Sequence, residues 1–281
     1  MDYAVAIIIV VYNCKLKDSV SYQKADHYKD ALLIIIIDNS NNREILLWNQ
    51  TESQKKKILY LTYECNIGLS KAYNCGIKLV QERFRHVKWI ITADQDTSLT
   101  DQYFETVFVH AFDKQSNLIF YPDVYAQNKK LSPSKLSSSY VNGTRGNITA
   151  INSGLMISVG VFDYLKYEEE LFLDMIDYDL FCQLYTLDLQ ECMLPMHVKI
   201  EQKFSGRTRN GAEKDYDRFK IYVMDYQRFC KKWNVNNYYK YYILLKRAVK
   251  LTLYYKNLEY IKLLLSSKSR KVSADQDDSD D

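Results

Sequence analysis

The sequence is poor in glycine and proline and contains no long hydrophobic run. Only 8 Gly and 3 Pro occur in 281 residues, which is well below the roughly 7% and 5% of average proteins and excludes collagen-like and low-complexity chains. The longest apolar stretches, residues 4–12 and 31–37, are much shorter than the roughly 18 residues that a membrane-spanning helix needs. With 47% hydrophobic and 26% charged residues, the composition is that of an ordinary globular protein with a packed core.

Disulfide, secretory and polyanion-binding signals are also missing. The six cysteines form no CxxC pair and no secretory leader precedes the first apolar run, so we expect a reduced, cytoplasmic protein. The Asn-x-Thr motifs at Asn49, Asn142 and Asn147 would then be chance matches. The formal net charge is only +3, and no nucleic-acid recognition module is present, so we expect no nucleic-acid partner.

Four short apolar runs, rich in β-branched residues, occupy the first hundred positions, at 4–12, 31–37, 58–62 and 88–93. Their apolarity is continuous rather than alternating, which indicates strands that are buried on both faces of a parallel sheet. Between the third and fourth runs, apolar residues recur at helical spacing after Ser70. We therefore predict a helix over 71–85 with Ser70 as its cap, and an α/β fold of right-handed βαβ units.

The rest of the chain divides into segments of different character. Residues 121–147 are polar and carry two of the three prolines, which predicts a mobile loop or an insertion over the site. A short strand is expected at 192–200, followed by a flexible basic lid. The predicted domains are a nucleotide-sugar-binding and catalytic domain over 1–215, a helical segment over 216–271 and a disordered acidic tail over 272–281.

Polar and acidic side chains follow three of the four apolar runs. They are Tyr12 and Asn13 after the first run, Asp38, Asn39 and Ser40 after the second, and Asp94, Gln95 and Asp96 after the fourth. Ligands of open parallel sheets bind outside the carboxyl ends of the strands, so we expect these residues to share one edge of the sheet. For residues 38–40, a turn capped by the aspartate is the alternative interpretation.

Asp94 and Asp96 are separated by one residue directly after a predicted strand. In extended backbone, this spacing directs both carboxylates to the same side. Hard oxygen ligands with open coordination positions suit a Mg²⁺ or Mn²⁺ ion that bridges a diphosphate. The alternative is an acidic pair that is simply solvated at a strand end.

Six short motifs of this sequence resemble those of a known family and occur in the same order. They are VVYN at 10–13, IIDNS at 36–40, NIGLSKAYNCGI at 66–77, TADQDT at 92–97, NSGLMIS at 152–158 and MIDYDLF at 175–181. Over roughly residues 3–206, the chain resembles a family 2 glycosyltransferase of the GT-A fold, a Rossmann-like, mostly parallel sheet flanked by helices. The DQD form and residues 66–77 are most similar to rhamnosyltransferase-like members that build bacterial surface polysaccharides.

The resemblance implies a donor site made of strand-end residues, a motif asparagine and two arginines of the lid. These residues are Tyr12, Asn13, Asp38, Asn66, Asp94, Gln95, Arg207 and Arg209. Asp38 would hold the base or ribose, and the two arginines would clamp the diphosphate, unless they belong to a solvated loop. Asp96, together with Asp94, would bind the Mn²⁺ or Mg²⁺ that neutralises charge on the departing nucleoside diphosphate.

The resemblance also implies a general base at the start of an acidic helix. Related enzymes carry a Glu-Asp pair there, and this chain has Ile176 and then Asp177, so Asp177 is the predicted base, with Asp179 and Asp174 as alternatives. Acids at a helix start are also stabilised by the helix dipole without any catalysis.

Two positions depart from the family pattern. Gln183 stands where the family often has arginine, which puts the role of that position in doubt. The family tends to place a metal-binding histidine shortly before the lid, and His197 is the available candidate, although Gln202 and Lys203 lie nearer the expected position. His197 is therefore either a metal ligand or a structural residue.

Residues 238–271 carry nine Lys or Arg and one acid, Glu259. Lys246, Arg247 and Lys250 fall on one arc of a helical projection. Such a segment would lie on an anionic membrane, on the inner face of the plasma membrane. Alternatively, it would pack as a helical subdomain on the core or against a second copy of the chain.

The predicted function is inverting transfer of a sugar from a nucleotide diphosphate donor to a hydroxyl group of a growing, lipid-linked surface glycan. The sugar would be rhamnose by analogy, with galactose, galactofuranose and glucose as alternatives. Because of the two departures, a degenerate subunit that binds donor or partner without turnover is the alternative function. A membrane-surface scaffold is a third.

Overall fold

The computed structural model describes residues 3–56, 58–112, 119–141, 147–202 and 212–265. The chain divides into two compact units, Met1–Ser205 and Gly206–Asp281. Arg207, Arg209 and the predicted acidic tail over 272–281 lie outside the described residues.

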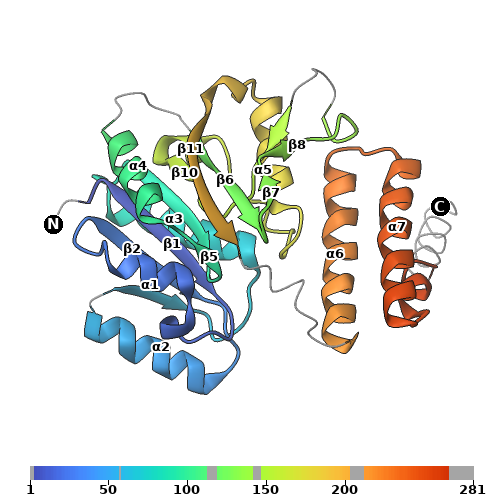
Figure 1. Cartoon of the computed structure of the whole chain (residues 1–281), viewed down its shortest axis with the longest axis horizontal. Coiled ribbons are helices and arrows are strands. Elements are labelled where there is room, and N and C mark those ends of the chain that lie inside the picture. The colour runs from blue at the N-terminus through green and yellow to red at the C-terminus, as the bar shows by residue number, and fades with distance from the viewer. Residues whose placement is uncertain (1–2, 57, 113–118, 142–146, 203–211, 266–281) are drawn as a thin grey trace, which may run out of the picture. The chain divides into compact units, whose positions relative to one another are not determined.

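A nine-stranded sheet forms the centre of the first unit, in the order β3-β2-β1-β4-β10-β6-β11-β5, with β7 paired to β6 (Figure 1). Six strands run in one direction: β1 (Val5–Val11), β2 (Leu32–Asp38), β3 (Leu59–Thr62), β4 (Trp89–Asp94), β6 (Ile119–Ala126) and β11 (Met193–Gln202). Three run antiparallel to their neighbours: β5 (Thr97–Ser98), β7 (Lys129–Ser132) and β10 (Met156–Ser158). The predicted mostly parallel α/β sheet is therefore confirmed.

The register of the first strands places their polar ends side by side. Every residue of β1 and β2 is buried, as expected for strands covered on both faces. β1 pairs with β2 from Val5 opposite Leu32 to Val11 opposite Asp38. On its other side, Val10 lies opposite Asp94 of β4, so two of the predicted site carboxylates end strands that flank β1.

Helices cover the sheet and short 3₁₀ turns join the elements. The helices of this unit are α1 (Val20–Asp26), α2 (Arg43–Lys56), α3 (Leu69–Arg83), α4 (Asp101–Ala111) and α5 (Ile176–Thr186), and the 3₁₀ turns are η1 (Leu16–Asp18), η2 (Val159–Asp163) and η3 (Gln190–Cys192). A Cβ added to Gly76 of α3 would meet Ile8 Cγ2 at 2.8 Å. Glycine at this position therefore allows α3 to approach β1 closely.

The predicted start of α3 needs a correction. The helix begins at Leu69, and its cap is Gly68 with φ 88°, not Ser70. Glycine reaches this left-handed backbone region without a steric penalty. Ser70 is buried within the first turn.

The prediction of a mobile loop over 121–147 is wrong where strands form, at residues 121–126, 129–132 and 134–135. The alternative, an insertion over the site, stays a prediction. Residues 119–126 form β6, which is largely buried, and residues 129–135 form β7 and β8 (Ser134–Lys135), the latter paired with β9 (Ile148–Thr149). The prediction relied on proline as a strand breaker. β10 pairs with β6 at Ile119 and Phe120, and β7 pairs with it from Val124, so Pro122 lies between the two ladders.

The second unit is helical, as its composition predicted. It contains α6 (Ala212–Lys232) and α7 (Asn237–Tyr255), followed by helical residues at 259–265. The Asn236 side chain caps α7 by accepting a hydrogen bond from the Tyr238 N–H. Within the described part of the chain, no helix combines the length and the apolarity that crossing a bilayer requires.

Candidate active site

Asp94 ends β4, and both oxygens of its carboxylate accept hydrogen bonds. The Tyr73 hydroxyl donates to Oδ1 at 2.9 Å, and the Gln202 amide donates to Oδ2 at 3.2 Å. The Asp94 N–H donates to Ser153 Oγ at 2.8 Å. Burial raises the pKa of Asp94, and the Tyr73 and Gln202 hydrogen bonds oppose that rise. Residues far apart in the sequence therefore fix this carboxylate at the strand end.

Gln95 ties the turn after β4 to the loop after β1. Its side-chain oxygen accepts from the Tyr12 N–H at 2.7 Å, and its backbone oxygen accepts from the Val20 N–H at 3.0 Å. The Tyr12 side chain is 44% exposed, so its ring is accessible beside this turn. Asp96 follows in the same turn and is half-buried.

Asp38 is fully buried at the end of β2. Its Oδ1 accepts from the Ser40 N–H at 2.9 Å, which is the aspartate-capped turn that the sequence left open. Its Oδ2 accepts from Asn49 Nδ2 at 2.7 Å and from the Tyr60 hydroxyl at 2.9 Å. In this arrangement the carboxylate anchors the strand end, and a donor molecule would have to displace one of these partners to touch it.

Asn49 of α2 is a site-forming residue that the sequence reveals only as part of an Asn-x-Thr motif. Its side chain accepts from the Leu16 N–H at 2.9 Å and donates to the Cys14 oxygen at 3.0 Å, in addition to Asp38. Asn49 and Ser53, four residues apart, are both fully buried. Two polar residues at helical spacing are the signal that would have indicated an inward-facing polar stripe.

Cys14 lies within electrostatic reach of two predicted site carboxylates. Burial raises the pKa of its thiol to about 11, and the charges of Asp18, Asp38 and Asp96 add to that rise. Because Asp38 and Asp96 act on the same group, both lie near the loop after β1. Asn13 shapes this loop: its φ is 47°, and its side-chain oxygen accepts from the Asn41 and Asn42 N–H groups at 3.3 Å.

Asp177 occupies the first turn of α5, which follows Met175 in the left-handed region at φ 65°. Its Oδ1 accepts from the Tyr178 N–H at 2.9 Å. Burial raises the pKa of Asp177 to about 7; backbone hydrogen bonds oppose the rise, and the charges of Asp174 and Asp94 increase it. Asp94, at the end of β4, is therefore within electrostatic reach of Asp177 at the start of α5.

Two fully buried tyrosines, Tyr73 and Tyr167, pack against each other next to Asp94. The ring centroids of Tyr73 and Tyr167 are 5.2 Å apart. Burial raises the pKa of Tyr167, and the charges of Asp94 and Asp177 raise it further. Asn74 fixes the Tyr167 backbone, because its side chain donates to the Tyr167 oxygen at 2.9 Å and accepts from the Tyr167 N–H at 3.2 Å.

The start of α3 joins the loop after β2 to the segment before α5. The Leu69 N–H donates to the Phe172 oxygen at 2.6 Å, and the Gly68 oxygen accepts from Asn39 Nδ2 at 3.2 Å. The Asn66 side chain accepts from the Gly68 N–H at 3.0 Å. Asn66 therefore shapes this turn.

The structure does not bring His197 to the carboxylates. His197 is exposed at an irregularity of β11, with φ 57°, five residues before Gln202. Strand residues advance by about 3.3 Å each, and by less at an irregularity, so His197 lies at most about 16 Å along the strand from Gln202. The β11 side chain that contacts Asp94 is Gln202.

Asp179 and the half-buried Gln183 are hydrogen-bonded within α5. The Gln183 Nε2 donates to Asp179 Oδ2 at 2.7 Å and to the Lys166 oxygen at 2.9 Å. Asp179 is fully buried. Gln183, in the position of the family arginine, therefore connects α5 to the preceding segment. Asp174 is half-buried before the helix and acts electrostatically on Asp177.

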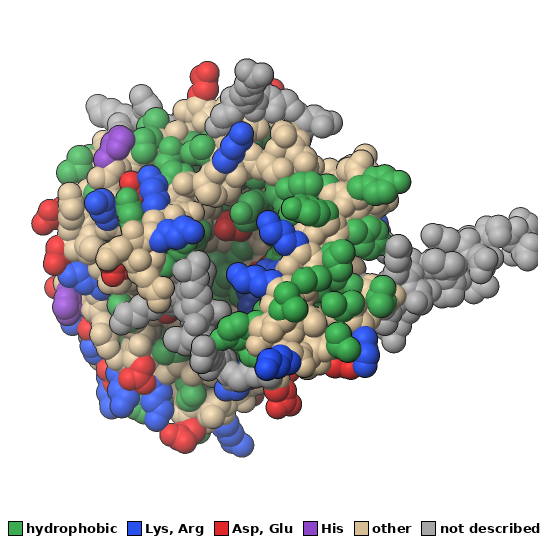
Figure 2. Space-filling model, turned by 45° about the vertical axis from the view of Figure 1, so that its right-hand side comes forward, with side chains coloured by type: hydrophobic (Ala, Val, Ile, Leu, Met, Phe, Trp, Pro, Cys, Tyr) green, Lys and Arg blue, Asp and Glu red, His purple; other side chains and the backbone are tan. Residues whose placement is uncertain are grey.

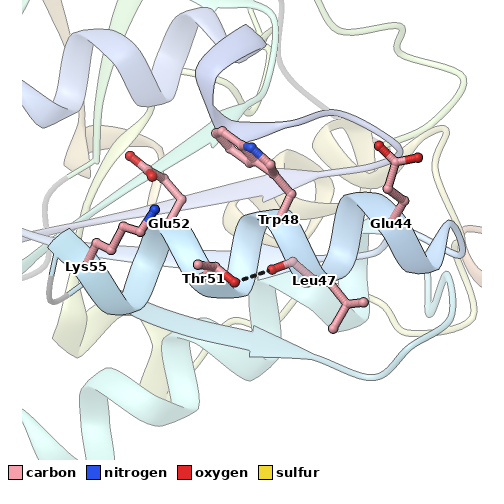
Figure 3. A pocket seen from close by; sticks show the side chains of 6 residues that line it. All are labelled: Glu44, Leu47, Trp48, Thr51, Glu52 and Lys55. Atoms are coloured by element: carbon pink, nitrogen blue, oxygen red, sulfur yellow. Dashed lines mark hydrogen bonds between the residues drawn. The ribbon is translucent and has the colours of Figure 1, made fainter.

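A shallow pocket of about 300 Å³ lies elsewhere, along α2 (Figure 3). It is lined by Glu44, Leu47, Trp48, Thr51, Glu52 and Lys55. Thr51 Oγ1 donates to the Leu47 oxygen at 2.8 Å within the helix. None of the predicted site residues lines this pocket, so it is separate from the candidate active site.

Residues 6–167 match the family model described as glycosyl transferase family 2, which is more than half of the chain. The chain belongs to glycosyl transferase family 2. The uncharacterized glycosyltransferase MJ1057 of Methanocaldococcus jannaschii is 21% identical to this family 2 chain over 253 residues, covering 82% of this chain and 84% of the relative. The predicted glycosyltransferase class is thus confirmed.

Solved structures of other proteins are similar to this family 2 chain at low sequence identity. Mannosyl-3-phosphoglycerate synthase from Rubrobacter xylanophilus is 11% identical with a TM-score of 0.50, covering 84% of this chain and 76% of that one. S. aureus TarS is 13% identical with a TM-score of 0.47, covering 84% and 68%. At these identities the similarity to the synthase concerns the fold.

The residues around Asp94 fit a hard divalent cation. Across the described ranges, no three His, Cys, Asp or Glu side chains are grouped so that they could hold a metal ion. However, Gln202 Oε1 is buried beside Asp94 and has no hydrogen-bond partner in the described part of this family 2 chain. Amide oxygens are ligands for Mg²⁺ and its relatives. The Asp94 carboxylate and this amide oxygen are therefore chemically suitable ligands, and Asp96 lies two residues further along the same turn.

Proposed function

We propose that the chain is an inverting glycosyltransferase that moves a sugar from a nucleotide diphosphate donor to a hydroxyl group of a growing, lipid-linked glycan. The observation that carries this proposal is the family 2 match over residues 6–167, together with the Asp94 carboxylate that Tyr73 and Gln202 hold at the end of β4. The charge of Asp94 also raises the pKa of Asp177. This effect supports one crevice in which a strand-end carboxylate faces the donor and a helix-start carboxylate faces the acceptor.

Donor binding falls to the loops at the ends of β1 and β4. The exposed ring of Tyr12 would contact the nucleotide, and Gln95 would hold that loop in place through the Tyr12 N–H. Asp38 and Asn13 would shape the pocket wall, because their side chains bind neighbouring backbone groups. Arg207 and Arg209, outside the described residues, remain the proposed diphosphate clamp.

Asp94, Asp96 and Gln202 would hold a Mn²⁺ or Mg²⁺ ion. Such an ion supplies positive charge that stabilises the departing nucleoside diphosphate. The Tyr73 hydroxyl orients the Asp94 carboxylate by donating to it, and Ser153 Oγ fixes the Asp94 backbone by accepting from its N–H. His197 is left out of this proposed ligand set, because it is exposed at an irregularity of β11.

Asp177 is the proposed general base. With a pKa of about 7, a large share of its carboxylates is ionised at neutral pH and able to take a proton. The acceptor oxygen forms a bond to the anomeric carbon, the bond from that carbon to the diphosphate oxygen breaks, and the hydroxyl proton passes to Asp177. Attack opposite the leaving group inverts the anomeric configuration.

Rhamnose is the proposed donor sugar, on the resemblance of the DQD and NIGLSKAYNCGI motifs, with galactose, galactofuranose and glucose as alternatives. The decisive experiment screens UDP-, GDP- and dTDP-sugars by thermal shift, with and without Mn²⁺, because a ligand that binds only the folded state raises the melting temperature. The stabilising donor is then assayed for metal-dependent nucleotide release, and the product anomer is determined by NMR.

The same experiment separates the enzyme from a degenerate donor-binding subunit. Gln183 and the remote His197 are the two departures that favour the degenerate subunit. Donor binding with nucleotide release that Asp177→Asn abolishes supports the enzyme. Donor binding without release by the wild-type chain supports the subunit.

A further inference from the structure

Helix α7 carries a wide apolar arc, and only one side of it is buried. Leu244, Ala248 and Thr252 are its buried residues, spaced four apart. A second set forms what we call the exposed stripe: Tyr238, Tyr242, Leu245, Val249 and Leu253, which are 89%, 58%, 51%, 38% and 74% exposed. At 100° per residue these five side chains fall within an arc of about 80°. Figure 2 shows hydrophobic side chains at the surface of the C-terminal unit, with lysines and arginines beside them.

The charge on α7 has one sign. Its sequence, NYYKYYILLKRAVKLTLYY, contains four basic residues and no acid. Lys246 and Lys250 are exposed and, on the helical projection, border the exposed stripe on the side away from the buried face. Arg247 departs from the predicted basic arc, because its guanidinium lies 3.6 Å from the centre of the Tyr222 ring of α6.

We propose that the exposed stripe of α7 docks on the surface of an anionic lipid bilayer, with Lys246 and Lys250 at the level of the headgroups. An interfacial helix buries an apolar face at the boundary of headgroups and acyl chains and keeps its basic residues beside it. Tyr238 and Tyr242 suit this depth, because a tyrosine ring is apolar and its hydroxyl remains hydrated. The helix lies in the membrane plane and does not span it. This docking does not depend on the transfer reaction.

Charge complementarity favours a bilayer over a second copy of the chain. Two copies of α7 that met through their stripes would bring Lys246 and Lys250 of each copy together with no α7 carboxylate to pair with them. Like charges at an interface oppose association. An anionic membrane offers the opposite charge, and basic residues near such a surface are attracted to it in a manner that salt weakens.

The test is vesicle sedimentation of the full chain at several salt concentrations. One set of vesicles is phosphatidylcholine alone, and the other also contains roughly 30% phosphatidylglycerol, which gives the surface a negative potential. We expect binding to the anionic vesicles at least tenfold tighter than to the neutral ones, and weaker as salt rises. Leu245→Ser with Leu253→Ser, and separately Lys246→Glu with Lys250→Glu, should each weaken that binding at least tenfold.

Matched control variants of the first unit distinguish docking through α7 from nonspecific binding to vesicles. Phe112→Ser removes an exposed hydrophobic side chain, 84% exposed, and Lys29→Glu with Lys88→Glu reverses two exposed charges. Both should bind vesicles as wild type does, and circular dichroism should show that every variant is folded. Equal binding by the wild-type chain and the α7 variants would overturn the proposal. So would a dimer in sedimentation velocity without lipid that the Leu245→Ser, Leu253→Ser change dissociates, because a second copy would then cover the stripe.

Discussion

The Tyr73 hydroxyl donates a hydrogen bond to the Asp94 carboxylate at 2.9 Å. Tyr73 belongs to the buried face of α3 and Asp94 ends β4, so a helix and a strand together orient one acidic side chain. Tyr73 is fully buried. The NIGLSKAYNCGI segment thus serves the candidate site through a contact that its glycines and asparagines do not reveal.

Tyr73→Phe should weaken metal and donor binding and leave the fold intact. The ring still packs against Tyr167, but Asp94 loses one donor, so its pKa should rise further and its carboxylate should be less well oriented. A hydrogen bond to a charged group is worth about 1.5–3 kcal/mol, so binding should weaken roughly tenfold or more. Isothermal titration with Mn²⁺ and the donor measures this. Tyr28→Phe, which removes a hydrogen bond to the remote Asp101, is the control and should bind as wild type.

Gln202→Leu should lower the affinity for Mn²⁺, and Gln202→His should preserve or raise it. Leucine removes the amide oxygen beside Asp94, whereas imidazole nitrogen also ligates transition metals. Electron paramagnetic resonance of free Mn²⁺ reports binding without any turnover. His197→Ala is the matched control. If that change lowers Mn²⁺ affinity and Gln202→Leu does not, the assignment of the β11 ligand is wrong.

The transfer rate should rise with pH and level off above about pH 7. Asp177 must be ionised to accept a proton, and its pKa is about 7. Asp177→Asn should reduce kcat by about 10²–10⁴-fold, the usual contribution of general base catalysis, and should remove this limb of the pH profile. Asp174→Asn tests the neighbouring carboxylate: losing its charge should shift the Asp177 limb to lower pH. A wild-type rate in Asp177→Asn would exclude this residue as the base.

The same carboxyl group should make the folded state less stable at high pH. The folded-state pKa of Asp177 is raised from 3.8 to about 7, so between these values the folded protein binds a proton that the unfolded chain has released. The free energy of unfolding therefore falls as pH rises from 4 to 7. Asp177→Asn should be the more stable protein at pH 8, by at least about 1 kcal/mol or roughly 2–4 °C in Tm.

Thermal unfolding at several pH values measures this difference. The advantage of Asp177→Asn should shrink as pH falls toward 4, because Asp177 of the wild type is then protonated in the folded state and no buried charge remains for asparagine to remove. An Asn variant that is less stable at every pH would show that the carboxylate has a structural partner and is not simply desolvated.

Gly68→Ala should lower the stability of the fold, whereas Ser70→Ala should leave it unchanged or raise it. A Cβ at position 68 would lie 2.9 Å from Phe172 Cδ2 and 3.0 Å from the Phe172 oxygen, at a φ of 88°. Crowding and strain of this kind cost about 1–3 kcal/mol, so Tm should fall. The buried Ser70 hydroxyl has no hydrogen-bond partner in the described part of the chain, so its removal should be neutral or stabilising. Loss of stability in Ser70→Ala comparable to that in Gly68→Ala would restore Ser70 as the helix cap.

Local patterns in the sequence determined the α/β class, the first four strands and the close approach of α3 to the sheet through Gly76. Continuous apolar runs, helical spacing and turn residues act over a few positions, so these features follow from neighbouring residues. The strand ends that carry Tyr12, Asp38 and Asp94 followed from the same patterns.

Only the tertiary structure decided which side chains meet. Gln202 contacts Asp94 across 108 positions of sequence, Asn49 joins Asp38 to the loop after β1, and an irregularity in β11 leaves His197 exposed. These contacts depend on strand register and on which face each residue presents. A shift of one residue in a strand reverses that face, so no local pattern fixes these contacts, and the folded sheet does.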